Sequence, residues 1–199
     1  MQKKMIIFEG LGSAGKTTLI EKLKHDLDSE FKIEILDNRH PKYASVLFND
    51  SKEISLDKTK CLHFCFRWTR LYLFFNCITN SNSDLFFFDR GILTNYIYGK
   101  EDNIPDYMIE ELINYFINIT KEKNIIYKTV FVDCELEVAN TRCALRKNID
   151  IENKICRNEM FSSYLKNISE YSFIRDLFVI DTSTDAFENY EKLLQFIRA

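Results

Sequence analysis

The sequence predicts an α/β protein in which a five-stranded parallel sheet is flanked by helices on both faces. Two observations predict this class. Short apolar runs alternate with longer amphipathic segments along the 199 residues, which is the pattern of strands joined by crossover helices. The first apolar run also leads directly into a glycine-rich turn and then a helical segment. Right-handed crossover connections follow from this order of elements.

The predicted strands are the apolar runs at residues 4–9, 32–37, 84–88, 128–133 and 176–181. The first and third contain uninterrupted apolar stretches, as buried parallel strands usually do. Helices are expected at residues 16–29, 58–80, 105–123, 135–147, 152–171 and 184–198. In the first of them, Leu19 and Leu23 share a face. No Gly/Ser/Pro-rich linker or internal repeat interrupts the chain, so one domain over residues 1–199 is expected.

The composition is that of a globular protein, with 46% hydrophobic and 29% charged residues. A formal net charge of −3 argues against a general nucleic-acid binder. Apolar runs fall well short of the roughly 18 residues of a membrane span, and the first run stops at Phe8, too early for a signal peptide. The six cysteines form no C-x-x-C pair, which favours reduced thiols and a cytoplasmic location.

Residues 10–17 read G-x-x-x-x-G-K-[ST] without a gap, the phosphate-binding loop of P-loop nucleotide-binding proteins. Its glycines let backbone N–H groups turn toward a phosphate, and the helix that follows directs its positive end at the anion. Lys16 is expected to reach the β- and γ-phosphates of ATP, and Thr17 to ligate Mg²⁺. A chance turn is the alternative, and the flanking strand and helix argue against it. The predicted nucleotide-binding residues are Gly10, Gly12, Ser13, Ala14, Gly15, Lys16, Thr17 and Thr18.

Polar residues follow every predicted strand, at the edge where ligands bind in such sheets. Asp133 and Asp181 are accounted for by solvated strand ends. Asp89-Arg90 is more informative, because an Asp at a strand end beside a phosphate loop holds Mg²⁺ or its waters. Asp89 could instead act as a base toward an acceptor oxygen, and Arg90 offers a planar fork for a phosphate. We therefore predict catalytic roles for both residues and a metal site formed by Asp89 and Thr17.

Arg67 and Arg70 are three residues apart on the predicted helix 58–80, so they share a face. An arginine buried in so apolar a helix without an anion is costly, which favours substrate binding. Phe64 and neighbouring aromatic residues either wall a base-binding slot or belong to the core. A second basic group ends helix 135–147 and is either a solvated face or a lid over a transferring phosphoryl group. Its members are Arg142, Arg146 and Lys147.

These motifs resemble those of thymidylate kinases, in the same order and over nearly the whole chain. Residues 8–18 resemble the opening of that family, and Arg39-His40-Pro41 resembles its segment after the second strand. Asp89-Arg90-Gly91 resembles the family's Asp-Arg-Tyr/His motif, with Thr94 and Tyr98 at the spacing of the Ser and Tyr that follow it.

Two further features extend the resemblance. Arg67 falls where the family places an arginine on its long substrate helix, and residues 142–155 resemble its lid segment. The resemblance implies a three-layer P-loop kinase fold. It also implies phosphoryl transfer from ATP, with Mg²⁺, to a nucleoside monophosphate, with dTMP as the first choice.

The resemblance also implies residue roles. Arg39 and Arg67 would hold the acceptor's phosphate, Tyr98 would contact its sugar or base, and a lid arginine would stabilise the transferred group. The substrate-binding residues are then Glu9, Arg39, Phe64, Arg67, Arg70 and Tyr98, and the catalytic residues are Lys16, Asp89, Arg90, Arg142 and Arg146. Small-molecule nucleotides are the expected partners, without nucleic acid or membrane. A homodimer is one assembly that the sequence allows.

The chain departs from the family mainly on the acceptor side. Gly12 stands where many members are acidic, and His40 replaces a Glu or Phe. Gly91 and Gly99 replace side chains that help to read the acceptor. Ser13 stands where some members carry an arginine, so the lid is the expected source of that charge.

The sequence also bears on three alternative functions. A deoxynucleoside kinase shares this plan and would take a neutral 5′-hydroxyl as acceptor. A GTPase-type switch requires Asn-Lys-x-Asp and Asp-x-x-Gly motifs, and the sequence has neither. A catalytically silent nucleotide-binding regulator is opposed by the intact set of Lys16, Thr17, Asp89 and Arg90.

Overall fold

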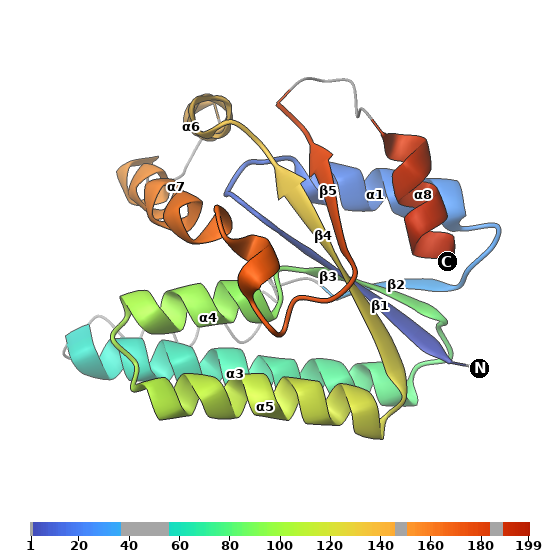
Figure 1. The fold of residues 1–199 in the computed structure, drawn as a ribbon, viewed down its shortest axis with the longest axis horizontal. Helices are drawn as coiled ribbons and strands as arrows, with labels where there is room; N and C mark the ends of the chain where they lie inside the picture. Colours follow the sequence, from blue (N-terminus) through green and yellow to red (C-terminus); the bar gives the residue numbers. More distant parts are fainter. Residues whose placement is uncertain (1, 37–55, 146–150, 184–188) are drawn as a thin grey trace.

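The computed structural model describes residues 2–36, 56–145, 151–183 and 189–199. Its five strands form one parallel sheet in the order β2-β3-β1-β4-β5 (Figure 1). They are β1 (Lys3–Gly10), β2 (Ile33–Leu36), β3 (Leu85–Asp89), β4 (Ile125–Asp133) and β5 (Leu177–Asp181). This confirms the predicted fold class and each predicted strand, with bounds that differ by at most three residues, at the start of β4.

Helices cover both faces of the sheet, which gives three layers. On one face lie α1 (Lys16–Leu27) and α8 (Tyr190–Arg198), and on the other lie α3 (Leu56–Asn80), α4 (Ile92–Glu101) and α5 (Asp106–Glu122) (Figure 1). Two more helices, α6 (Leu136–Ala144) and α7 (Ile151–Leu165), lie beside the carboxyl ends of the strands. This architecture is consistent with a P-loop kinase fold.

The core is continuous through the central strands because both of their faces are covered. Phe8 of β1 and Phe87 of β3 meet edge to face, with ring centroids 5.4 Å apart. Phe88 meets Phe74 of α3 in the same way at 4.8 Å. The apolar face predicted for the first helix is confirmed, since Leu19 and Leu23 are fully buried.

Three helices of the structure differ from the sequence prediction. Residues 92–101, which were not predicted to be helical, form α4. The helix predicted over 152–171 ends at Leu165 and is followed by a short 3₁₀ turn, η2 (Ile168–Glu170). The last helix begins at Tyr190, and residues 184–188 lie outside the described residues.

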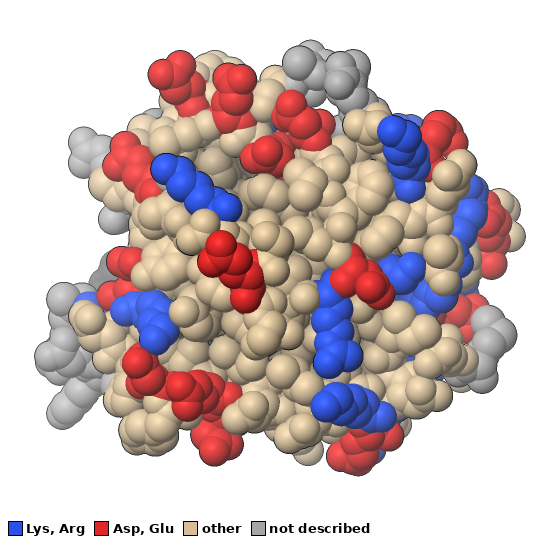
Figure 2. All heavy atoms as spheres, viewed as in Figure 1, with Lys and Arg blue, Asp and Glu red and all other residues tan. Residues whose placement is uncertain are grey.

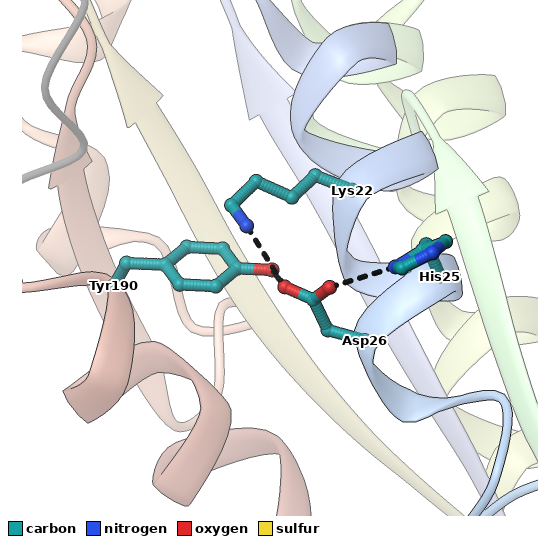
Figure 3. A network of polar contacts seen from close by, with 4 residues as sticks. All are labelled: Lys22, His25, Asp26 and Tyr190. Carbon is teal, nitrogen blue, oxygen red and sulfur yellow. Dashed lines mark hydrogen bonds and ion pairs between the residues drawn. The ribbon is translucent and has the colours of Figure 1, made fainter.

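Helix α8 is held to α1 by a polar network around Asp26 (Figure 3). The Asp26 carboxylate accepts hydrogen bonds from Tyr190 at 2.8 Å and from Lys22 at 2.9 Å, and it lies 3.0 Å from His25 Nδ1. The contacts with His25, Lys22 and Tyr190 lower the pKa of Asp26. Burial and the neighbouring carboxylate raise the pKa of Tyr190. The network therefore ties the last helix to the first.

The surface carries charges of both signs. On the face shown in Figure 2, Lys and Arg side chains lie in small groups beside Asp and Glu side chains. Within the described ranges, no helix is both long enough and apolar enough to cross a membrane. The described cysteines are free thiols, namely Cys65, Cys77, Cys134, Cys143 and Cys156.

Candidate functional site

The glycine-rich loop joins the end of β1 to the start of α1, as predicted. Gly15 precedes the helix with φ +88°, a left-handed conformation that favours glycine. A Cβ on Gly10 would overlap the carbonyl oxygen of Val132 in β4. The Thr182 hydroxyl, directly after β5, lies 2.6 Å from the Ala14 carbonyl oxygen and 2.8 Å from that of Asp133. The neighbouring strands therefore fix the shape of the loop.

The interior of the loop contains two polar groups suited to a phosphate. Lys16 is buried, and its ammonium donates hydrogen bonds to the carbonyls of Gly10 at 3.1 Å and Leu11 at 2.6 Å. Ser13 has φ +64°, and its hydroxyl oxygen is buried without a hydrogen-bond partner. A buried polar atom without a partner calls for an explanation, and a bound phosphate oxygen would satisfy this one.

Asp89 lies beside the loop because β3 pairs with β1, in the register Phe8 to Asp89. Its Oδ2 lies 3.5 Å from the Thr17 hydroxyl, at the outer limit of a hydrogen bond, and its Oδ1 is buried without a partner. A carboxylate and a hydroxyl next to a phosphate site are donors that Mg²⁺ takes together with phosphate oxygens and water. The residues present therefore fit the predicted metal.

Glu9 is bound by the turn that follows β3. Its carboxylate accepts hydrogen bonds from the Thr94 hydroxyl at 2.6 Å, from Gly91 N–H at 2.9 Å and from Thr94 N–H at 3.3 Å. Burial raises the pKa of Glu9, against these hydrogen bonds and the charge of Arg90. The carboxylate predicted to bind substrate thus lies at the N-terminus of α4, where a negative charge is favoured.

Arg90 occupies the turn between β3 and α4 with φ +67°, in the left-handed region that a residue other than glycine rarely adopts. Its N–H donates to the Phe8 carbonyl at 3.0 Å. Its guanidinium lies 5.6 Å from the centre of the Phe161 ring of α7. The unusual backbone conformation is thus held by β1, and the side chain lies on an aromatic surface.

Arg67 of α3 lies against Tyr98 of α4, with the guanidinium carbon 4.5 Å from the ring centre. It also donates to Asp102 at 3.1 Å, and its other terminal nitrogen, Nη1, is buried without a hydrogen-bond partner. Burial lowers the pKa of Arg67, and the nearby positive charge of Arg157 acts in the same direction. Arg157 of α7 lies 6.0 Å from the centre of the same Tyr98 ring.

A three-arginine cluster, defined here as Arg67, Arg90 and Arg157, therefore surrounds a pair of aromatic rings. Tyr98 and Phe161 meet edge to face with centroids 5.0 Å apart. Asp102 contributes an opposite charge through its ion pair with Arg67. Guanidinium groups gathered in this way favour an anionic ligand, since their mutual repulsion would be relieved by it.

Three other predicted residues have contacts outside the three-arginine cluster. Phe64 is fully buried, and a Cβ on Gly99 would lie 3.5 Å from its ring. The guanidinium of Arg70 lies 5.6 Å from the centre of the Phe74 ring. Arg142 donates to the Thr182 carbonyl at 2.7 Å and lies 3.6 Å from Cys134 Sγ, so it braces the residue that holds the loop.

Other predicted residues lie outside the described residues. They are Arg39, His40 and Pro41 of the segment after the second strand, and Arg146 and Lys147 of the predicted lid. Their roles stay predictions. Of the lid segment 142–155, the structure describes residues 142–145 and 151–155.

Four residues that sequence reasoning missed contribute to the site. Arg157, Asn158 and Phe161 come from α7, where Phe161 lies four residues after Arg157 and three after Asn158 and so neighbours both. Asn95 of α4 is buried, and its amide oxygen has no hydrogen-bond partner. Asn95 and Tyr98 are three residues apart and therefore share a face of α4. This spacing indicates a site residue only where a helix is expected, and the sequence did not predict this helix.

The fold and this site define a class of α/β protein with a phosphate loop at the carboxyl edge of its sheet and a cationic cluster beside it. The chain is similar to a protein named probable thymidylate kinase 1 from Saccharolobus solfataricus. The two are 27% identical over 198 residues, which span 98% of this chain and 97% of the relative. No family model matches the chain.

Proposed function

We propose that the protein is a kinase that transfers the γ-phosphoryl group of ATP to a nucleoside monophosphate, with dTMP as the first candidate. The observation that carries the proposal is the meeting of two half-sites at one edge of the sheet. One is the phosphate loop with Lys16 and Asp89, and the other is the three-arginine cluster. The name of the similar protein and the similarity over almost the full length support the same activity.

The donor half is the loop and the residues that line it. The Lys16 ammonium and the Ser13 hydroxyl would bind phosphate oxygens of ATP, together with backbone N–H groups at the start of α1. Thr17 and Asp89 would hold Mg²⁺, which when bound neutralises charge on the β- and γ-phosphates. The protein then contributes position and electrostatic stabilisation, because phosphoryl transfer requires little covalent chemistry from side chains.

The acceptor half favours a charged substrate over a neutral nucleoside. Arg90, directly after Asp89, can bind an acceptor phosphate close to the donor loop, and Arg157, which is exposed, adds a second guanidinium. The buried, unpaired atoms Arg67 Nη1 and Asn95 Oδ1 supply one donor and one acceptor for further polar groups of the ligand. A nucleoside without a phosphate would leave this positive charge uncompensated.

Release of ADP from ATP and Mg²⁺, measured against a panel of nucleosides and nucleoside monophosphates, tests the proposal. We expect turnover with dTMP and none with thymidine. Lys16→Ala is expected to lower kcat by about 10²-fold or more, as for loss of a charge-stabilising group. Lys24→Ala is the control. It changes an exposed lysine of the same helix and should leave kcat unchanged.

Other results of this experiment would contradict the proposal, each in a different way. Turnover with thymidine alone would replace this proposal with a deoxynucleoside kinase. ATP binding without turnover on any acceptor would indicate a nucleotide-binding regulator. Full activity of the Lys16→Ala protein would overturn the role of the loop.

A further inference from the structure

Asn158 of α7 reaches the phosphate loop and binds both backbone groups of one loop residue. The Gly12 N–H donates to Asn158 Oδ1 at 2.8 Å, and Asn158 Nδ2 donates to the Gly12 carbonyl at 3.2 Å. The same Nδ2 donates to Asn140 Oδ1 of α6 at 3.0 Å. Asn158 is 3% exposed, so water competes little with these bonds.

We propose that Asn158 is a positioning residue that acts through Gly12 to hold the phosphate loop in its nucleotide-binding shape. The proposal rests on the function proposed above and deepens it. Thr182 ties the loop at Ala14, and Asn158 of α7 ties it two residues earlier, at Gly12. The two ties together leave the loop little freedom to rearrange before a nucleotide binds, and preorganisation of this kind raises affinity.

An amide is the side chain that this position requires. Gly12 presents one donor and one acceptor, and the amide of Asn offers the matching acceptor and donor on one planar unit. An aspartate would still accept from the Gly12 N–H. It would face the Gly12 carbonyl and the Asn140 oxygen without a proton to donate, and it would add a negative charge beside the phosphate site.

The glycine at position 12 is explained by the same contact. A Cβ there would lie 2.9 Å from Asn158 Oδ1, while the next nearest atoms are at 3.8 and 3.9 Å. Gly12 is not among the glycines with positive φ, so the backbone accepts an alanine there, and the Asn158 side chain would have to shift to make room for it. Gly12 and Asn158 are therefore expected to depend on each other.

Helix α7 brings the same face to the acceptor side. Phe161, three residues after Asn158, packs on Tyr98 and lies under Arg90. The contact between Asn158 and Gly12 therefore fixes the donor loop relative to the helix that carries Arg157 and Phe161. Loss of this contact is therefore expected to weaken nucleotide binding, in addition to any effect on folding.

The test measures the Kd of Mg·ADP by calorimetry on the full chain, together with Tm and the KM of ATP. Asn158→Ala is expected to raise Kd and KM about tenfold, the size of losing one to two hydrogen bonds at a buried site. Asn158→Asp should raise them at least as much. Asn140→Ala, which leaves both Gly12 bonds in place, should change Kd by less than about threefold. Glu159→Ala, an exposed change on the same helix, is the matched control and should change nothing.

A double-mutant cycle makes the test specific to the pair. Gly12→Ala should weaken ADP binding in the native background and have little further effect once Asn158 is alanine. Additive effects, or an Asn158→Ala protein that binds ADP like the native protein while Lys16→Ala does not, would overturn the proposal. If Asn158→Ala does not fold, the Asn158→Asp and Gly12→Ala proteins provide the test. The proposal is overturned if both bind ADP with the affinity of the native protein. Failure of the unaltered protein to bind ADP would instead overturn the proposed function.

Discussion

The Thr94 hydroxyl donates a 2.6 Å hydrogen bond to the carboxylate of Glu9, a residue 85 positions earlier in the chain. Glu9 is the last residue but one of the buried strand β1, and Thr94 lies in the first turn of α4. The carboxylate also accepts from two N–H groups of that turn. Glu9 thus supplies from another strand the acceptor that Gly91, the residue before the helix, lacks a side chain to provide.

The buried carboxylate predicts a pH dependence of stability. Burial raises the pKa of Glu9 above its ordinary value of 4.5. Between 4.5 and the raised pKa the folded state therefore binds more protons than the unfolded state, and stability falls as pH rises through this window. Glu9→Gln, which does not ionise, should remove this slope.

Urea unfolding at a series of pH values from 4 to 8 checks this expectation, with the free energy of unfolding compared between the native and Glu9→Gln proteins at each pH. Glu110→Gln, an exposed change on α5, provides the control. Equal slopes for the native and Glu9→Gln proteins would contradict the raised pKa.

The anchor at Thr182 predicts a combined effect on stability and nucleotide binding. Thr182→Val keeps the shape of the side chain and removes the hydroxyl that lies between the carbonyls of Ala14 and Asp133. The Asp133 carbonyl keeps the N–H of residue 182 as a donor, so the Ala14 carbonyl is the group that loses its contact. We expect a loss of about 1–3 kcal/mol in the free energy of unfolding and a higher KM for ATP.

The matched control for that change is Thr120→Val. The Thr120 hydroxyl is also buried and also donates to a backbone carbonyl, that of Ile117 at 2.8 Å, but in α5. It should lower stability by about 1 kcal/mol and leave the KM of ATP unchanged. If the native and Thr182→Val proteins have equal KM values for ATP, Thr182 does not position the phosphate loop.

The exposed arginine of α7 predicts a selective effect on the acceptor. Arg157→Ala should raise the KM of dTMP about tenfold, the size of one hydrogen bond to a charged group, with little change in the KM of ATP or in Tm. Arg175→Ala offers a matched control, because Arg175 also lies over a tyrosine ring, 5.7 Å from that of Tyr127, before the amino end of β5. If the KM for dTMP is unchanged in the Arg157→Ala protein, Arg157 does not contribute to acceptor binding.

The network in Figure 3 predicts a purely structural effect. Tyr190→Phe removes a hydrogen bond that joins α8 to α1 and should lower Tm without changing the Kd of ADP. Because the folded pKa of Asp26 is lowered, its contribution to stability is present above the ordinary value of 3.8 and is lost as pH falls below it. The Tm difference between the native and Asp26→Asn proteins should therefore shrink in acid. A change in ADP affinity for Tyr190→Phe would show that the network acts on the site.

Some parts of the site could be predicted because they depend on neighbours in the chain. The loop at residues 10–17 has its glycines, Lys16 and Thr17 at fixed spacing, and the apolar strand and amphipathic helix around it show their periodicity locally. The approach of Asp89 to Thr17 followed from one further rule, that the carboxyl ends of parallel strands meet at one edge of the sheet. The structure places the two side chains 3.5 Å apart.

Helix α4 could not be predicted in the same way. Its sequence, with Ile92, Thr94, Tyr96 and Ile97, is rich in β-branched and aromatic residues of modest helix propensity. Six of its residues are buried, so the amphipathic pattern is weak. The helix depends on burial of these residues and on the distant carboxylate of Glu9.

The sequence by itself determined the fold class, the phosphate loop and the carboxylate beside it, because each is encoded by residue types at short, regular spacing. Only the tertiary structure decided that residues 92–101 are helical, that Arg157 joins Arg67 at the Tyr98 ring, and that Asn158 binds Gly12. The last contact joins residues 146 positions apart. The physical reason is that burial and hydrogen bonding between distant segments outweigh local propensity, and a pattern of neighbouring residues contains no information about them.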